Sequence, residues 1–150
     1  VICTRDKDLR QVPVNVYSWE LGRQPAFGPV RIDDIGGLIL YETGDKNKLK
    51  GTGFAFFCAQ MLMGDGVDNI PGVPKVGPVT TYHILSPVLK CEHSDYTIDT
   101  LINEVEYAYQ DYYGDSNWEH LMVEQGQLLW VVRKLNEDGS PVIWERGKSK

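Results

Sequence analysis

Apolar residues recur with helical spacing in several stretches of the chain, most clearly over residues 52–63. In this stretch apolar residues fall at i, i+3, i+4, i+7 and i+8, which places them on one face of a helix. Gly64 follows directly and is the residue type that most often ends a helix. A helix packed through one apolar stripe is therefore predicted here. The stripe consists of Phe54, Phe57, Cys58, Met61 and Leu62.

Three further helices are predicted towards the C-terminus. The first begins at Pro78, which suits an initial helical turn, and ends at about Leu85, ahead of Pro87. Another covers 97–113, and the last begins after Asn117 as N-cap. The apolar face of 97–113 is predicted to hold Ile98, Leu101, Ile102, Val105, Tyr109 and Tyr112, and the last helix to carry Leu121, Met122, Leu128, Leu129 and Val132.

Shorter apolar pieces broken by glycine and proline indicate strands and hairpins over the first 50 residues. The pieces 14–17 and 38–41 have strand-like composition, and 44–48 is predicted to be a charged loop tip. The lysines of this region could contact DNA, although a solvated loop is the simpler interpretation. A last strand is predicted at 142–144, after a turn at 136–139.

The opening residues, 1–4, form a short β-prone run that leads directly into charged residues at 5–8. A buried strand of a parallel sheet has this pattern where it leaves the sheet. Because a lone strand is unstable, its neighbours are expected upstream, and the chain is expected to be a fragment of a larger protein.

Composition fits a folded domain of ordinary size and excludes several classes of protein. The chain has 150 residues and 42% hydrophobic residues. No apolar run has the roughly 20 residues that a membrane span needs. Three cysteines without CxxC spacing argue against a zinc site and favour free thiols in a reducing cytosol, so we expect a cytoplasmic protein. These features leave a cytoplasmic globular protein as the expectation.

The net charge of −6 argues by itself against nucleic-acid binding, which favours basic surfaces. That inference reverses if acidic residues bind cations, or if a basic surface lies in a part of the protein outside this chain.

The segment 64–78 contains the residues that most strongly suggest metal and phosphate binding. Asp65 and Asp68 are three residues apart just beyond a helix end, so their carboxylates can converge on one cation. Oxygen ligands of this kind suit Mg²⁺ or Mn²⁺. The following glycines and prolines allow close approach to a large ligand, and the next helix begins with free N–H groups. Together with Lys75 this pattern predicts a phosphate-binding cradle.

Two blocks of sequence resemble the 5′→3′ exonuclease and flap-endonuclease family, of the phage exonuclease and DNA polymerase I 5′-nuclease type. The pattern Gly-Asp-x-x-Asp-Asn-Ile-Pro-Gly-Val-x-x-x-Gly-Pro at 64–78 is similar to the helix–hairpin–helix signature of that family. The block Thr-x-Asp-Lys-Asp-Leu-x-Gln at 4–11 resembles its strand-end motif. A weaker likeness to phage exonucleases lies in Tyr-Gly at 113–114 and Leu-Leu-Trp at 128–130.

The resemblance implies an α/β to mostly α fold. Residues 1–50 would be the C-terminal edge of a PIN-like α/β nuclease core. Residues 51–150 would be a helix–hairpin–helix, SAM-like DNA-binding domain. The family uses two divalent metals, Mg²⁺ or Mn²⁺, in a full active site, and in several members a monovalent cation such as K⁺ also binds at the hairpin. The implied partner is duplex DNA with 5′ ends, nicks or flaps, bound without sequence preference.

The resemblance also implies roles for individual residues. The catalytic, metal-holding carboxylates would be Asp6, Asp8, Asp65 and Asp68. Asp6 and Asp8 would share a face by alternating on a strand, although any one of the four could instead cap a turn or face solvent. Asn69 is expected to stabilise the turn rather than to bind metal. The residues expected to contact DNA, mainly through the backbone, are Gly72, Val73, Lys75, Val76 and Gly77.

The family's other acidic ligands and its basic helical arch belong to a region upstream of the first strand. The upstream half of the nuclease domain is therefore an implied partner, and this chain alone is expected to be inactive or nearly so. The alternative is a helix–hairpin–helix module that binds duplex DNA without catalysis, for which carboxylates at 6 and 8 would have no purpose. A structural calcium loop is disfavoured because the regular ligand spacing and terminal Glu of an EF-hand are absent.

Overall fold

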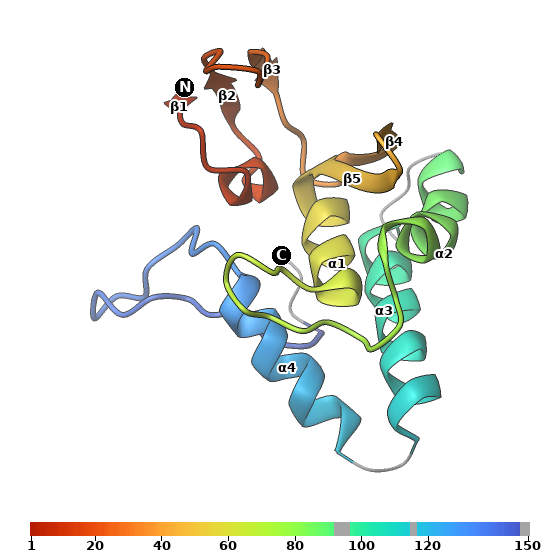
Figure 1. Cartoon of the computed structure of the whole chain (residues 1–150). Coiled ribbons are helices and arrows are strands. Elements are labelled where there is room, and N and C mark those ends of the chain that lie inside the picture. Colours follow the sequence, from red (N-terminus) through yellow and green to blue (C-terminus); the bar gives the residue numbers. More distant parts are fainter. Residues whose placement is uncertain (92–96, 115–116, 148–150) are drawn as a thin grey trace.

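The computed structural model describes residues 1–91, 97–114 and 117–147. Within these residues the chain is a mixed α/β structure of four α-helices and two small β-sheets (Figure 1). The strands come first in the chain and the helices follow, with helix α1 in the middle of the molecule (Figure 1). None of these helices combines the length and apolar character needed to cross a membrane.

The first sheet has three strands in the order β1–β2–β3. Strand β1 (Ile2–Cys3) pairs in parallel with β2 (Asn15–Ser18), which pairs antiparallel with β3 (Phe27–Arg31). The predicted N-terminal strand and its parallel pairing are confirmed. Its partner, β2, comes later in the chain, whereas the neighbours were expected upstream. Ile2 is half-buried and Cys3 exposed, so β1 is less covered than predicted.

The second sheet is a hairpin of β4 (Gly37–Thr43) and β5 (Lys46–Thr52). The predicted loop at 44–48 is too long, because only Gly44 and Asp45 form the turn and the lysines that follow belong to β5. Gly44 has a φ of 59°, a conformation that tight hairpin turns require and that glycine adopts without strain. The lysines of this region therefore lie on a regular strand.

Helix α1 (Gly53–Met63) confirms the predicted helix, and its C-cap, Gly64, has a φ of 74°. The helix is buried all round rather than along one stripe, since every residue from Gly53 to Leu62 is buried. It is enclosed by the β4–β5 hairpin, a short 3₁₀-helix η1 (Asp8–Gln11) and the other three α-helices. Residues on α1 are therefore held from all sides.

Helices α2 (Pro78–Lys90), α3 (Thr97–Tyr113) and α4 (Trp118–Leu129) complete the fold. The predicted end of α2 before Pro87 is wrong. Pro87 is exposed and removes only one backbone hydrogen bond. Val88 and Leu89 pack against the core, and this packing stabilises the helix beyond Pro87.

The predicted bounds of α3 and the start of α4 after Asn117 are confirmed. Three residues predicted on their apolar faces lie elsewhere. Tyr112 and Leu128 are exposed, and Val132 lies beyond the end of α4 and is also exposed. The buried side of α3 is thus narrower than its apolar pattern indicates.

No strand forms at 142–144 in the described part of the chain. Asn136 donates its N–H to the Ser140 carbonyl at 2.8 Å, so the predicted turn is present, but a single bridge joins Leu135 and Pro141. Trp144 packs into the core, with its ring centroid 5.6 Å from that of Phe57. Burial of this indole fixes the C-terminal segment in place of strand pairing.

Candidate metal centre and hairpin

Asp65 and Asp68 lie on a closed turn directly after α1. The Asp65 N–H donates to the Ile70 carbonyl at 2.8 Å, and the Ile70 N–H donates back to the Asp65 carbonyl at 2.9 Å. The Asp65 carboxylate also accepts the N–H of Val67 at 3.0 Å. Asn69, with a φ of 58°, supplies the left-handed residue of the turn, as its predicted structural role requires.

Two glycines let this turn fold back on the end of α1. Gly72 has a φ of 67°, and a Cβ at this position would overlap the backbone nitrogen of Gly64 and lie 2.6 Å from the Leu62 carbonyl oxygen. A Cβ at Gly64 would in turn lie 2.6 Å from the carbonyl carbon of Pro71. Backbone thus packs on backbone, which fixes Asp65 relative to α1.

Asp8 reaches the same place from the 3₁₀-helix η1. The expectation that Asp6 and Asp8 alternate on a strand is wrong, because β1 ends at Cys3 and the chain then turns. The exposed Asp6 accepts the Asp8 N–H at 2.9 Å, and its own N–H donates to Thr4 Oγ1 at 3.0 Å. Asp6 therefore caps the turn that presents Asp8.

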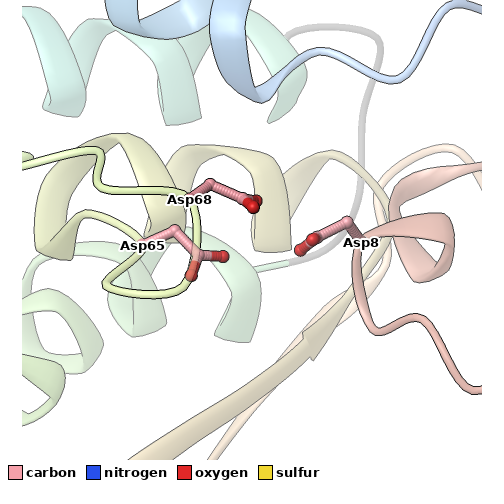
Figure 2. A group of neighbouring side chains, drawn as sticks. All are labelled: Asp8, Asp65 and Asp68. Carbon is pink, nitrogen blue, oxygen red and sulfur yellow. The ribbon is translucent and has the colours of Figure 1, made fainter.

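Asp8, Asp65 and Asp68 form one carboxylate cluster. Each contributes an oxygen, and these oxygens all lie within 4.8 Å of one another. Figure 2 shows Asp65 and Asp68 on one loop, with Asp8 extending toward them from a separate segment. Asp65 is buried, Asp8 half-buried and Asp68 exposed, so the cluster opens to solvent on the Asp68 side. Among the described residues, Asp6 is not part of such a group.

The three carboxylates are the kind of ligand that Mg²⁺ and Mn²⁺ prefer, so the cluster can be compared with the geometry that such an ion requires. Such ions prefer carboxylate oxygens about 2.1 Å away, so two ligands of one ion lie at most about 4.2 Å apart. The three oxygens lie within 4.8 Å of one another, which is close to this limit, so an ion bound by all three would require them to move closer together. Only some of the six positions around the ion would be filled, which leaves room for water and a phosphate.

Two residues absent from the sequence-based site hold the carboxylates together. Lys7 donates from Nζ to Asp8 Oδ1 at 2.9 Å and to Asp65 Oδ2. Gln60, on α1, donates from Nε2 to Asp8 Oδ1 at 2.7 Å and to Asp65 Oδ2 at 2.8 Å. Both donors bridge the two segments of chain that carry the acidic residues.

The pKa values of the paired groups shift as expected for this arrangement. Burial disfavours the charge of Lys7, but its hydrogen bonds to Asp65 and Asp8 outweigh burial and raise the pKa of Lys7. Burial likewise opposes ionisation of Asp65, yet hydrogen bonds from Lys7 and Val67 and the charge of Lys7 lower the pKa of Asp65. Asp65 is therefore held as a carboxylate, the form that binds metal.

The side chain of Gln60 is oriented by a hydrogen bond from Gln11. Gln11 Nε2 donates to Gln60 Oε1 at 2.6 Å and to the Leu129 carbonyl at 3.3 Å. Both glutamines are buried. Since its amide oxygen accepts from Gln11, Gln60 must point its NH₂ group at the acidic residues. A sequence signal for Gln60 exists, because it is the single strongly polar side chain within the apolar helix 53–63.

The predicted DNA-contacting residues divide into two groups. Gly72 and Val73 are buried, and their N–H groups donate to Gln125 Oε1 and to the Leu62 carbonyl, both at 2.8 Å. The Val76 N–H donates to Val73. Lys75 is exposed with a φ of 69°, and Gly77 precedes the first turn of α2. Lys75 and the start of α2 are therefore the accessible part of the segment 72–78.

Comparison with models of known protein families, with curated proteins and with solved structures finds no match to this chain.

Proposed function

We propose that this chain is the C-terminal part of a metal-dependent 5′→3′ exonuclease or flap endonuclease. The observation that supports this most is the meeting of Asp8 with Asp65 and Asp68. These residues come from the two separate blocks of sequence that resemble the 5′-nuclease family. A chance arrangement of acidic surface residues has no reason to bring these two blocks together.

In the proposed site, Asp8, Asp65 and Asp68 hold a Mg²⁺ or Mn²⁺ ion. A bound ion of this kind supplies an activated water and stabilises charge on the leaving oxygen of a phosphodiester. The protein's own contribution is orientation. Gln60 fixes Asp8 and Asp65, and Asp6 supports Asp8 from the turn. The half-exposed Lys7 sits at the edge of the cluster and can donate to a phosphate oxygen of the substrate.

The finer fold belongs to the same proposal. Residues 1–50 would complete the edge of a PIN-like core, and α1, the turns at 64–77 and α2 would be the helix–hairpin–helix. Lys75 and the first N–H groups of α2 would contact the duplex backbone, which positions DNA without reading its sequence. K⁺ bound by backbone carbonyls of the hairpin is part of this proposal.

The upstream half of the nuclease would supply the remaining acidic ligands and a second metal. Three carboxylates close to one another provide for one ion, whereas the proposed mechanism uses two. The chain alone is therefore proposed to bind metal and DNA but to cleave poorly.

One observation favours the alternative of a non-catalytic DNA-binding module. Lys7 already neutralises part of the carboxylate charge, and a lysine ion pair can hold acidic residues together for structural reasons alone. In that case the cluster would not need a cation.

Metal titration separates the two proposals. Isothermal titration of the chain with Mn²⁺ should give one site, and Asp65→Asn should weaken it on the order of 100-fold, because a charged ligand becomes neutral. Asp45→Asn, an exposed aspartate in the β4–β5 turn, is the matched control and should bind normally. Absence of binding by the unmodified chain would favour the non-catalytic module.

Cleavage is tested with a 5′-labelled flapped duplex in Mg²⁺ or Mn²⁺, using the chain alone and the chain extended by its upstream sequence. The expected result is cleavage by the extended protein that Asp65→Asn abolishes. Duplex binding without cleavage by the extended protein would overturn the nuclease proposal.

A further inference from the structure

A cleft lies beside the carboxylate cluster, and Lys7 belongs to both. It has a volume of about 620 Å³ and lies between the N-terminal segment, the loop before β3 and the β4–β5 hairpin. Its charged lining is entirely basic among the described residues, with no Asp or Glu. We call it the basic cleft, and its cationic residues are Arg5, Lys7, Arg10, Arg23, Lys48 and Lys50.

Most of this positive charge has no carboxylate partner. Lys7 pairs with Asp8 and Asp65, but none of the other five cations forms an ion pair with a described residue. The chain carries 21 acidic residues against 15 basic ones, so unpaired cations gathered in one cleft are unexpected. Like charges at close range repel, and an anionic ligand removes that repulsion.

Three of the cations are held in place by neutral contacts. Arg10 lies over the Phe27 ring at 4.2 Å, and its buried Nε has no hydrogen-bond partner in the described structure. Lys50 lies over the Tyr41 ring at 4.3 Å. Arg5 donates to the Trp19 carbonyl and to the Gln24 side chain. These contacts orient the charges without cancelling them, which leaves them for a ligand.

We propose that the basic cleft binds the phosphate backbone of a single-stranded nucleic acid. Its volume is within the ~300–1,000 Å³ typical of small-ligand sites, which is enough for about one or two nucleotides of an extended strand to enter. Arginine and lysine side chains in a groove are the usual means of following a single strand. The choice of nucleic acid rests on the proposed function, because Lys7 belongs to both sites and a strand in the cleft would run to the carboxylate cluster.

The test measures the fluorescence anisotropy of labelled oligothymidine with the whole chain, at low salt and with EDTA to prevent cleavage. The variant Arg23→Gln/Lys48→Gln/Lys50→Gln removes three exposed cations of the cleft. The matched control Arg31→Gln/Lys90→Gln/Lys134→Gln removes three exposed cations elsewhere. Thermal unfolding followed by circular dichroism checks that both remain folded.

The cleft variant should bind oligothymidine about tenfold more weakly than the unmodified chain, and the control within about twofold. The slope of log affinity against log salt should fall by about 2 in the cleft variant alone. Equal losses in the two triple variants, or no binding of oligothymidine by the unmodified chain, would overturn the proposal. Competition by polyglutamate as strong as by oligothymidine would overturn it in favour of an acidic peptide.

Failure of this proposal can be told apart from failure of the proposed function. Asp65→Asn should lose Mn²⁺ binding and keep oligothymidine binding, a pattern that supports both. Oligothymidine binding through the cleft by a chain that binds no Mn²⁺ would overturn the nuclease proposal and leave the cleft standing. Mn²⁺ binding with equal effects of the two triple variants would overturn the cleft alone.

Discussion

The carboxylate cluster and the basic cleft lie next to each other and differ in whether their charges are paired. In the cluster, Asp8 and Asp65 each accept hydrogen bonds from Lys7 and Gln60, so the negative charge is organised and partly neutralised. In the cleft, Arg5, Arg10 and Lys50 are oriented by aromatic rings and neutral acceptors, and among the described residues every cation except Lys7 lacks a carboxylate partner.

This difference is the basis for proposing a cation at one site and an anion at the other. Preorganised carboxylates bind a cation without a large rearrangement, whereas cations without a carboxylate partner favour the binding of an anion. Lys7 contributes to both sites, so one molecule that carries phosphate and recruits a divalent cation would satisfy them together. A nucleic-acid strand has both properties.

The largest effect is expected from breaking the turn that carries the cluster. Gly72→Ala would place a Cβ against Gly64 and Leu62 in a left-handed conformation, and should lower the free energy of unfolding by about 3 kcal/mol. Urea unfolding followed by tryptophan fluorescence measures this. The control is Gly22→Ala, which has a φ of 58° but nothing within 4 Å of the new Cβ, and should cost about 1 kcal/mol. Equal losses would mean that backbone packing does not fix the turn.

A smaller effect is expected from loosening the cluster while keeping its acidic residues. Gln60→Leu retains bulk on α1 but removes both amide hydrogen bonds to the carboxylates, and should weaken Mn²⁺ binding about tenfold. Oligothymidine binding should stay unchanged, since Gln60 does not line the basic cleft. Gln127→Leu, a glutamine on α4 away from the acidic residues, serves as control. Unchanged Mn²⁺ affinity in Gln60→Leu would show that the carboxylates do not need this support.

The smallest effect, and the one most specific to the comparison, is expected at Lys7. Lys7→Met removes a competing ammonium from the cluster and should raise Mn²⁺ affinity about fivefold. The repulsion between this unit charge and a divalent ion about 5 Å away in water is roughly 1.7 kcal/mol, and screening by salt lowers it to about 1 kcal/mol. The same change should weaken oligothymidine binding about twofold. Lys46→Met, exposed on β5, is the control for both titrations. Changes of the same sign in both affinities would contradict a lysine shared between sites of opposite charge.

The sequence predicts the helical part of the molecule well where periodicity and stop residues agree. The bounds of α3 and the end of α1 at Gly64 follow from apolar spacing and glycine position. The predicted end of α2 before Pro87 is wrong because the effect of a proline depends on which side of the helix faces solvent. The local sequence does not determine that side. The segment around Trp144 misleads in the same way, since a buried side chain rather than a partner strand fixes it.

The sequence predicts the acidic residues of the candidate site, but it does not predict the residues that hold them in position. Asp8, Asp65 and Asp68 are found from the two sequence blocks, but their order in space depends on η1, whose formation moves Asp6 out of the group. The role of Gln60 depends on Gln11, which comes from a distant segment and sets the direction of the Gln60 amide. The local sequence around Gln60 does not contain this information. The basic cleft is assembled from three segments far apart in the chain, so no single stretch of sequence reveals it.

The most direct test of the account compares Asp8→Asn with Asp6→Asn by titration with Mn²⁺. Asp8 lies in the carboxylate cluster, whereas Asp6 accepts a backbone N–H through an oxygen that asparagine retains. We expect Asp8→Asn to weaken Mn²⁺ binding on the order of 100-fold and Asp6→Asn to change it by less than about threefold. Equal losses in the two variants, or normal binding by Asp8→Asn, would contradict a metal site built from Asp8, Asp65 and Asp68.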